Sequence, residues 1–139
     1  DVVIVTVPDD LHDEYIVRFM PTRDIEDGSV QIYTEVPAGT SVWMSRRDYD
    51  KVAAGAESMA ARIAGKLKER RPKLVFHFDC AGRGKVIFRE EQKLQLLRML
   101  QEKVDPNVPW IGLYTYGEIG PVGEHNCFHN YTAVLTVVH

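Results

Sequence analysis

The stretch Leu74-Val75-Phe76-His77-Phe78-Asp79-Cys80-Ala81-Gly82-Arg83-Gly84 organises the predicted fold. Its first half is an apolar run typical of a buried strand, with His77 and Asp79 as its only strongly polar members. The two glycines that follow permit a sharp turn and close approach of another group to the backbone. A helical pattern comes next, and this order exposes backbone N–H groups and a guanidinium at the carboxyl edge of a sheet. We therefore expect any binding site to form at this edge.

Four β-patterned segments and one amphipathic helix precede this stretch. The predicted strands cover residues 2–7, 15–20, 30–36 and 41–44. Turn residues separate them, which favours an antiparallel meander. Ser45 and Asp48 both offer helix N-caps, and apolar residues then recur at steps of three and four until Pro72 ends the helix.

A second helix, a strand, a loop and a final strand follow. The helix is predicted from near Arg89 to Val104, and the strand covers residues 110–116. A glycine-rich loop then runs to about Asn130, and residues 132–138 form the last strand. Each helix joins two strands, so each crossover is predicted to make a right-handed parallel pair. We expect the last two strands to form an antiparallel hairpin with a long loop.

Together these elements predict an α+β fold, a mixed and mainly antiparallel sheet with two helices packed on it. The chain of 139 residues is long enough for one domain with a real core, so residues 1–139 are taken as a single domain. Because the first residue is Asp1, we expect this domain to be part of a longer protein.

Composition excludes some classes of partner. The net charge of -3 gives no electrostatic footprint for nucleic acid. No apolar run approaches the length of a membrane span, so we expect no membrane contact in this segment. Cys80 and Cys127 form no short-spaced pair, which indicates a reducing cytoplasm rather than a disulfide scaffold.

Three segments, taken together, have the order and spacing of one known family. They are Cys80-Ala81-Gly82-Arg83-Gly84, Gly112-Leu113-Tyr114-Thr115-Tyr116-Gly117-Glu118-Ile119-Gly120-Pro121, and Phe128-His129-Asn130-Tyr131-Thr132. The chain resembles the C-terminal half of the FIST sensory domain, whose patterns are CxGR, GxYxYGEI and HNxT. The Val36-Pro37-Ala38-Gly39 turn and the Arg46-Arg47-Asp48 helix start are similar too.

The resemblance implies a small-molecule-sensing domain of an intracellular, cytoplasmic signal transduction protein, with amino acids as proposed ligands. Such domains occur beside bacterial kinase, cyclase and chemoreceptor modules and in some eukaryotic F-box proteins. The implied partners are a small ligand and a neighbouring signalling module or N-terminal FIST half. No catalytic residue carries over from the family, so we expect no enzyme activity, and no cofactor is implied.

The candidate ligand-binding residues surround the two glycine-rich strand ends. They are Cys80, Gly82, Arg83, Tyr116, Gly117, Glu118, Asn130 and Thr132. The planar guanidinium of Arg83 suits a carboxylate or phosphate, and Glu118 suits an amine, so together they suit a zwitterion such as an amino acid. The structural alternative is that Arg83 pairs with Glu118, and that Glu118 holds its loop through backbone N–H groups. For Asn130 and Thr132 the alternative is turn chemistry.

Two alternatives to a sensor remain open. An enzyme could use Cys80 or Glu118, but Cys80 needs a nearby base, and His77 points to the opposite face of the strand. His125 or His129 would have to serve as the base; otherwise Cys80 is a buried packing residue. For His77 and Asp79, a satisfied pair is favoured over a catalytic dyad. An interaction or dimerisation module, using exposed strand edges or the tryptophans, is the other alternative.

A weak metal candidate lies near the end of the loop. His125, Cys127 and His129 stand at alternate positions, so in an extended segment all three project to one side. Imidazole and thiolate suit zinc or another soft metal. Ordinary loop chemistry produces the same pattern, and we predict no metal.

Overall fold

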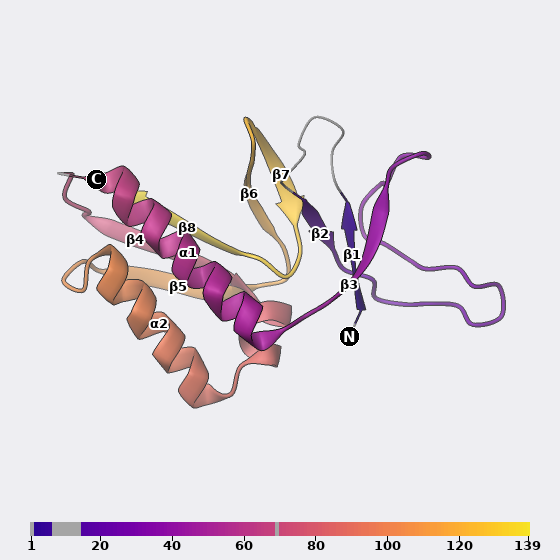
Figure 1. The fold of residues 1–139 in the computed structure, drawn as a ribbon, viewed down its shortest axis with the longest axis horizontal. Helices are drawn as coiled ribbons and strands as arrows, with labels where there is room; N and C mark the ends of the chain where they lie inside the picture. The colour runs from indigo at the N-terminus through magenta and orange to yellow at the C-terminus, as the bar shows by residue number, and fades with distance from the viewer. Residues whose placement is uncertain (1, 7–14, 69) are drawn as a thin grey trace.

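A computed structural model describes residues 2–6, 15–68 and 70–139, and these form two three-stranded sheets, a hairpin and two main helices (Figure 1). The elements are β1 (Val2–Thr6), β2 (Ile16–Arg18), β3 (Val42–Arg46), α1 (Tyr49–Leu67), β4 (Leu74–Cys80), the π-helical turn η1 (Ala81–Lys85), α2 (Glu90–Val104), β5 (Trp110–Thr115), β6 (Glu118–Val122), β7 (His125–His129) and β8 (Ala133–Val138).

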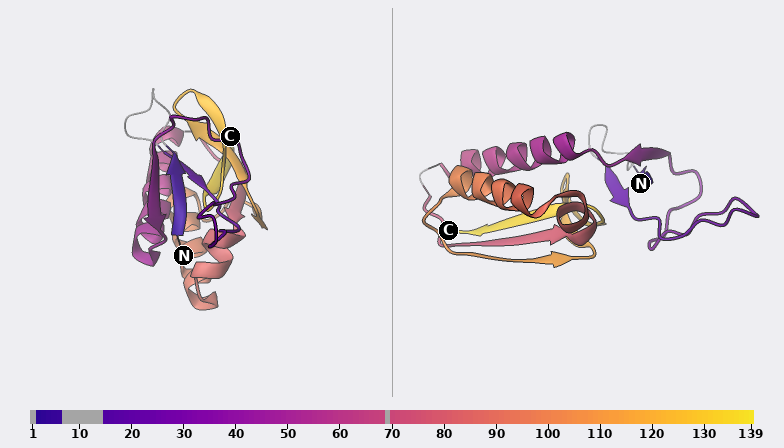
Figure 2. Two further views of the ribbon diagram at one scale, coloured as in Figure 1. Left: turned by 90° about the vertical axis from the view of Figure 1, so that its right-hand side faces the viewer. Right: turned by 90° about the horizontal axis from the view of Figure 1, so that it is seen from below.

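The main sheet has the strand order β5-β4-β8, and α1 and α2 lie on one of its faces (Figure 2). β4 runs parallel to β5, with α2 as the crossover between them, and antiparallel to β8. The core lies between the helices and the sheet, where Ala56, Ala60 and Leu100 are buried. The predicted α+β fold and its mixed sheet are confirmed.

Both helices begin where the sequence predicts. The side chain of Asp48 accepts a hydrogen bond from the Lys51 backbone N–H at 3.1 Å, which caps α1. At the start of α2, the Arg89 N–H donates to the Gln92 side chain at 2.8 Å. The apolar stripes also face inward, because Ala56 and Leu67 of α1 and Leu100 of α2 are buried.

The other face of the main sheet carries apolar side chains that no helix of the described residues covers. The rings of Phe76 and Phe78 stack there, with centroids 6.3 Å apart. Their register neighbours on β5, Ile111 and Leu113, are 55% and 56% exposed. The sheet therefore has one face that packs against the helices, where Trp110 and Leu135 join the core, and one apolar face that is open.

Two predictions about the N-terminal part are wrong. Residues 30–36 form no strand; a single bridge joins Val30 to Arg23. The turn-rich composition on both sides leaves this segment without a long partner. β1 pairs antiparallel with both β2 and β3, as in a meander, but α1 joins β3 to a strand of a different sheet and so makes no parallel pair. The predicted end of the first strand, residue 7, lies outside the described residues.

Two predictions about the C-terminal part are also wrong. The segment expected to be a loop folds as the β6–β7 hairpin, with Glu118 opposite His129 and a turn made possible by Gly123 at φ 58°. β8 pairs with β4 instead of β5. β5 forms hydrogen bonds with only one edge of β4, and the backbone N–H and C=O groups on the other edge bind β8. In the sequence, the hairpin lies between β5 and β8. In space, its strand β7 lies beside β2 (Figure 1).

Candidate functional site

The glycine turn after β4 folds as η1, and both of its glycines make the close approaches that the sequence predicts. A Cβ on Gly82 would lie 2.4 Å from a carbon of the Tyr131 ring. A Cβ on Gly84 would lie 1.8 Å from a carboxylate oxygen of Asp79. The groups that approach are side chains of the protein itself. Single π-helical turns of this kind occur frequently at functional sites.

Arg83 is buried and forms an ion pair with Asp79. Its Nη1 donates to Asp79 Oδ1 at 2.9 Å, and the two residues are 6% and 7% exposed. The partner is therefore Asp79 rather than Glu118, the structural alternative that the sequence suggested. The predicted pair between His77 and Asp79 is not formed: Asp79 binds Arg83, and Nε2 of His77 is buried without a hydrogen-bond partner. The ion pair fastens η1 to the end of the strand that precedes it.

Glu118 is buried as well, and it joins the β5–β6 turn to the start of β8. Its carboxylate accepts hydrogen bonds from the hydroxyl of Thr115, from the hydroxyl of Thr132 at 2.8 Å and from the Thr132 N–H at 3.4 Å. This agrees with the predicted role of holding its loop, although two of the three donors are hydroxyls. Arg83 and Glu118 each have partners of their own beneath packed side chains.

Asn130 forms hydrogen bonds both to the segment around β2 and to the β5–β6 turn. Its side-chain oxygen accepts from the Phe19 N–H at 3.0 Å, and its side-chain nitrogen donates to the Tyr116 carbonyl at 3.1 Å. Its own N–H donates to the carbonyl of Val17 at 3.0 Å. The residue is 3% exposed. Asn130 thus positions three segments around one end of the main sheet.

A cavity of about 810 Å³, here called the edge cavity, opens beside these segments. It is lined by Phe19, Met20, Pro21, Thr22, Arg23, Arg47, Cys80, Ala81, Gly82, Lys85, Val86, Tyr116, Asn130 and Tyr131. Four of the eight predicted binding residues are among these: Cys80, Gly82, Tyr116 and Asn130. The other four, Arg83, Gly117, Glu118 and Thr132, lie outside its lining.

Arg47 and Tyr131 are among the lining residues that the sequence reasoning missed. The Arg47 guanidinium lies 4.8 Å from the centroid of the Tyr131 ring and donates a hydrogen bond to the Gly82 carbonyl. Tyr131 adopts φ 57°, a left-handed conformation that is rare for a bulky residue. Both residues belong to segments that carry the family resemblance, and this membership was the sequence signal that could have identified them as site residues.

Charge distinguishes the edge cavity from an ordinary surface depression. Arg23, Arg47 and Lys85 line it, and among the lining residues that the structure describes there is no aspartate or glutamate. Burial raises the pKa of the Tyr131 hydroxyl, with the Arg47 charge acting in the opposite direction. The cavity is therefore lined by cations and neutral polar groups, which suits an anion.

The geometry gives no support to a nucleophilic cysteine. Cys80 is 4% exposed, and burial raises the pKa of its thiol, which keeps the sulfur protonated. Of the described residues that line the edge cavity beside it, none is a histidine. Its backbone N–H donates to the Thr132 carbonyl at 2.9 Å, so the residue helps to hold the start of β8.

The weak metal candidate has the predicted extended backbone, but its two histidines are too far apart along the strand to bind one ion. His125, Cys127 and His129 alternate along β7. In an extended strand, residues four apart are separated by about 13 Å, too far for both to reach one ion with bonds of about 2 Å. Over residues 15–68 and 70–139, no group of three or more histidine, cysteine or acidic side chains could hold a metal. His129 is buried, which lowers its pKa.

The α+β domain thus has a cavity beside the end of β4, and strand ends of this kind are the usual ligand positions in α/β sheets. The family model of the FIST C domain matches residues 2–121, and the chain belongs to this family. FIST C domains are regarded as sensory or signalling domains. The predicted membership is confirmed.

The similar curated proteins are uncharacterized. A protein of Mycobacterium bovis is 27% identical over 129 residues, which cover 89% of this chain and 31% of that protein. A protein of Mycobacterium tuberculosis is 28% identical over the same shares. The chain thus spans about a third of the length of these relatives. No solved structure matches it. Neither α1 nor α2 is long and apolar enough to cross a membrane.

Proposed function

We propose that this FIST C domain senses a small carboxylate-bearing metabolite in the edge cavity on behalf of a larger signalling protein. The observation that carries the proposal is the presence of three cationic side chains in a lining whose described residues include no acid. The volume of about 810 Å³ lies within the range of about 300–1,000 Å³ that is typical of small-molecule sites.

Arg47 is the central residue of this proposal. Its planar guanidinium matches a carboxylate in shape and charge, and the Tyr131 ring lies 4.8 Å from it as a cation–π partner. Arg23 and Lys85, on two other segments, add positive charge around the same space. A carboxylate in the edge cavity would therefore be close to three cations from separate segments: Arg23, Lys85 of η1, and Arg47 beside the α1 cap.

The cavity favours a simple organic acid over a zwitterion. A site that used Arg83 for the carboxylate and Glu118 for the amine would have to separate both from their buried partners. Separating a buried ion pair costs several kcal/mol, on the order of 3–5. An amino acid could still bind through its carboxylate, with its ammonium group toward solvent. Amino acids therefore belong in the test, beside organic acids that carry no amine.

Signalling would follow from a shift of population between positions of η1. Arg47 donates to the Gly82 carbonyl in η1, and a ligand carboxylate competes for the same guanidinium. Arg47 also immediately precedes Asp48, the cap of α1, so a change in its position reaches both η1 and α1. No chemistry on the ligand is required.

Thermal unfolding with a panel of acids and their amides tests the proposal. Succinate, glutamate and the uncharged succinamide differ in charge at similar size. A ligand at about 100 times its Kd should stabilise the domain by about 2.7 kcal/mol, so we expect a rise in Tm of several degrees with at least one carboxylate and none with the amide.

Arg47→Gln should abolish this rise, and Arg46→Gln is the matched control. Arg46 is the exposed neighbour with the same charge and does not line the edge cavity. If no carboxylate raises the Tm, or if both variants weaken the response equally, the proposed site is wrong.

A second function, protein interaction, is favoured by the open face of the main sheet. Ile111 and Leu113 are more than half exposed there, and single domains rarely leave such neighbours uncovered. Because the relatives are about three times as long, we propose that another part of the longer protein covers this face. The domain alone should self-associate with rising concentration in sedimentation velocity. Ile111→Ser with Leu113→Ser should reduce this association, and an unchanged profile would remove the support for the second function.

A further inference from the structure

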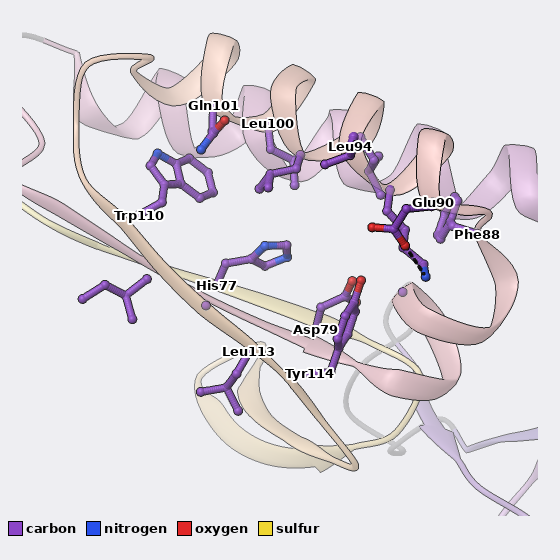
Figure 3. A pocket seen from close by; sticks show the side chains of 16 residues that line it. His77, Asp79, Phe88, Glu90, Leu94, Leu100, Gln101, Trp110, Leu113 and Tyr114 are labelled. Carbon is purple, nitrogen blue, oxygen red and sulfur yellow. Dashed lines mark hydrogen bonds and ion pairs between the residues drawn. The ribbon is translucent and has the colours of Figure 1, made fainter.

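A second cavity, of about 400 Å³, lies between α2 and the main sheet and is here called the inter-layer pocket (Figure 3). η1 is a wall of both cavities. Gly84 lines the inter-layer pocket, whereas Gly82 and Lys85 line the edge cavity. Nothing in the function proposed above uses the inter-layer pocket.

The pocket has an apolar roof and a mixed floor. Leu94, Leu97 and Leu100 of α2 form part of the roof. His77 and Trp110 rise from the sheet toward these leucines (Figure 3), and their ring centroids are 6.2 Å apart at 89°. A shape of this kind, mostly apolar with a few polar points, is typical of sites for small organic molecules.

Two buried polar atoms in its walls have no hydrogen-bond partner. They are Nε2 of His77 and Nε1 of Trp110. A buried polar group left unsatisfied costs about 1–3 kcal/mol, so native proteins satisfy nearly all of them, with water or a ligand where protein groups are absent. Two such atoms on neighbouring strands, both at one cavity, indicate an occupant that forms hydrogen bonds.

The charges around the pocket are already neutralised within the protein. Asp79 is paired with Arg83 at 2.9 Å, and Glu90 is paired with Lys93 at 3.2 Å. Within the described part of the chain, these pairs include every charged residue that lines the pocket. Burial lowers the pKa of His77, so its ring is neutral at neutral pH. An ionic occupant would therefore find no counter-charge.

We infer that the inter-layer pocket is a binding site for an uncharged organic molecule that has an apolar body and a hydrogen-bond-accepting oxygen. The indole N–H of Trp110 donates to this oxygen, since it can act only as a donor. His77 Nε2 adds a second hydrogen bond, and the leucines of α2 pack against the apolar body. Aromatic ketones and amides have this chemistry.

Fluorescence of Trp110 tests the inference directly. Trp43→Phe removes the exposed tryptophan of β3, so that emission reports on the pocket alone. Acetophenone is the probe, ethylbenzene lacks the acceptor, and benzoate adds a charge. We expect saturable quenching by acetophenone and binding at least about fivefold weaker for ethylbenzene, since a lost hydrogen bond costs about 1 kcal/mol or more. Benzoate should also bind at least about fivefold weaker, because its charge would be buried without a free counter-charge.

A filling variant and its control locate the binding. In the Trp43→Phe background, Leu94→Phe enlarges a half-exposed side chain of the pocket, and Ile119→Phe makes a similar change at an exposed site on the hairpin. Only Leu94→Phe should weaken acetophenone, by about tenfold. Absence of saturation, equal binding by benzoate, or equal binding by the two variants would overturn the inference. Circular dichroism verifies that each variant is folded.

Discussion

The two cavities on either side of η1 differ in how their charges are arranged. In the edge cavity, Arg23, Arg47 and Lys85 contribute three cations, and none of the other lining residues within the described ranges is acidic. In the inter-layer pocket, every charged lining residue has an ion-pair partner. The same short turn contributes to both walls, and Arg83 folds back to Asp79 instead of joining the other cations. The direction in which one arginine points thus separates a cavity suited to anions from one suited to neutral molecules.

The largest expected effect comes from breaking the Asp79–Arg83 pair. Asp79→Ala leaves a buried guanidinium without its counter-charge and should lower the free energy of unfolding by about 3–5 kcal/mol in urea titrations. Glu90→Ala breaks an exposed pair and should cost no more than about 1 kcal/mol. Similar losses for the two variants would mean that the buried pair does not determine the difference between the cavities.

The next effect concerns the carboxylate at the base of the hairpin. Thr132→Val removes the hydroxyl that donates to Glu118 at 2.8 Å and should lower the free energy of unfolding by about 1.5–3 kcal/mol. Thr136→Val makes the same chemical change at an exposed position of β8 and serves as the control. A loss at Thr132 no greater than the loss at Thr136 would contradict the role given to Glu118.

A smaller effect is expected where Tyr131 packs on η1. Gly82→Ala places a Cβ 2.4 Å from the ring and should cost about 1–3 kcal/mol. The cost should fall in a Tyr131→Ala background, because the clash is then absent, and a double-mutant cycle measures this coupling. Gly55→Ala, in open space within α1, should instead stabilise by about 0.5–1 kcal/mol. Additive effects of Gly82→Ala and Tyr131→Ala would refute the contact.

The smallest effect is the pH dependence contributed by the inter-layer pocket. Burial lowers the pKa of His77 below its ordinary 6.5, so the unfolded chain binds the proton more readily. Stability should therefore decrease as pH falls below about 6.5, through the window between the two pKa values. His77→Phe should reduce this slope in unfolding titrations between about pH 5 and pH 8. A residual slope from His129, which is shifted in the same direction, should remain. An unchanged slope would show that His77 is already accessible to protons.

Local patterns predicted the centre of the fold well. β4, a turn after it and α2 follow from an apolar run, two glycines and a helical period, all read within about 30 residues. The pairing of β8 with β4 could not be read in this way, because it depends on which sheet edge remains after β5 has bound. The hairpin was missed because glycines and Pro121 mask the alternation of its strands.

The candidate site was predicted only in part for a similar reason. Sequence position identified Cys80, Gly82, Tyr116 and Asn130 as cavity residues, since each lies next to a strand end. It could not identify Arg47, whose contact with Gly82 spans 35 positions. Nor could it foresee that a π-helical turn brings Arg83 back over the strand it follows, within reach of Asp79.

The place of β8 beside β4 determines where this polypeptide can safely be cut. The family match ends at residue 121, inside β6. A truncation there would delete β7 and β8, leave the backbone of β4 bare along one side and remove Thr132 from Glu118. Such a bare strand is a template for aggregation. The boundary drawn by similarity is therefore not a boundary at which the chain folds, and expression of this domain should extend through residue 138.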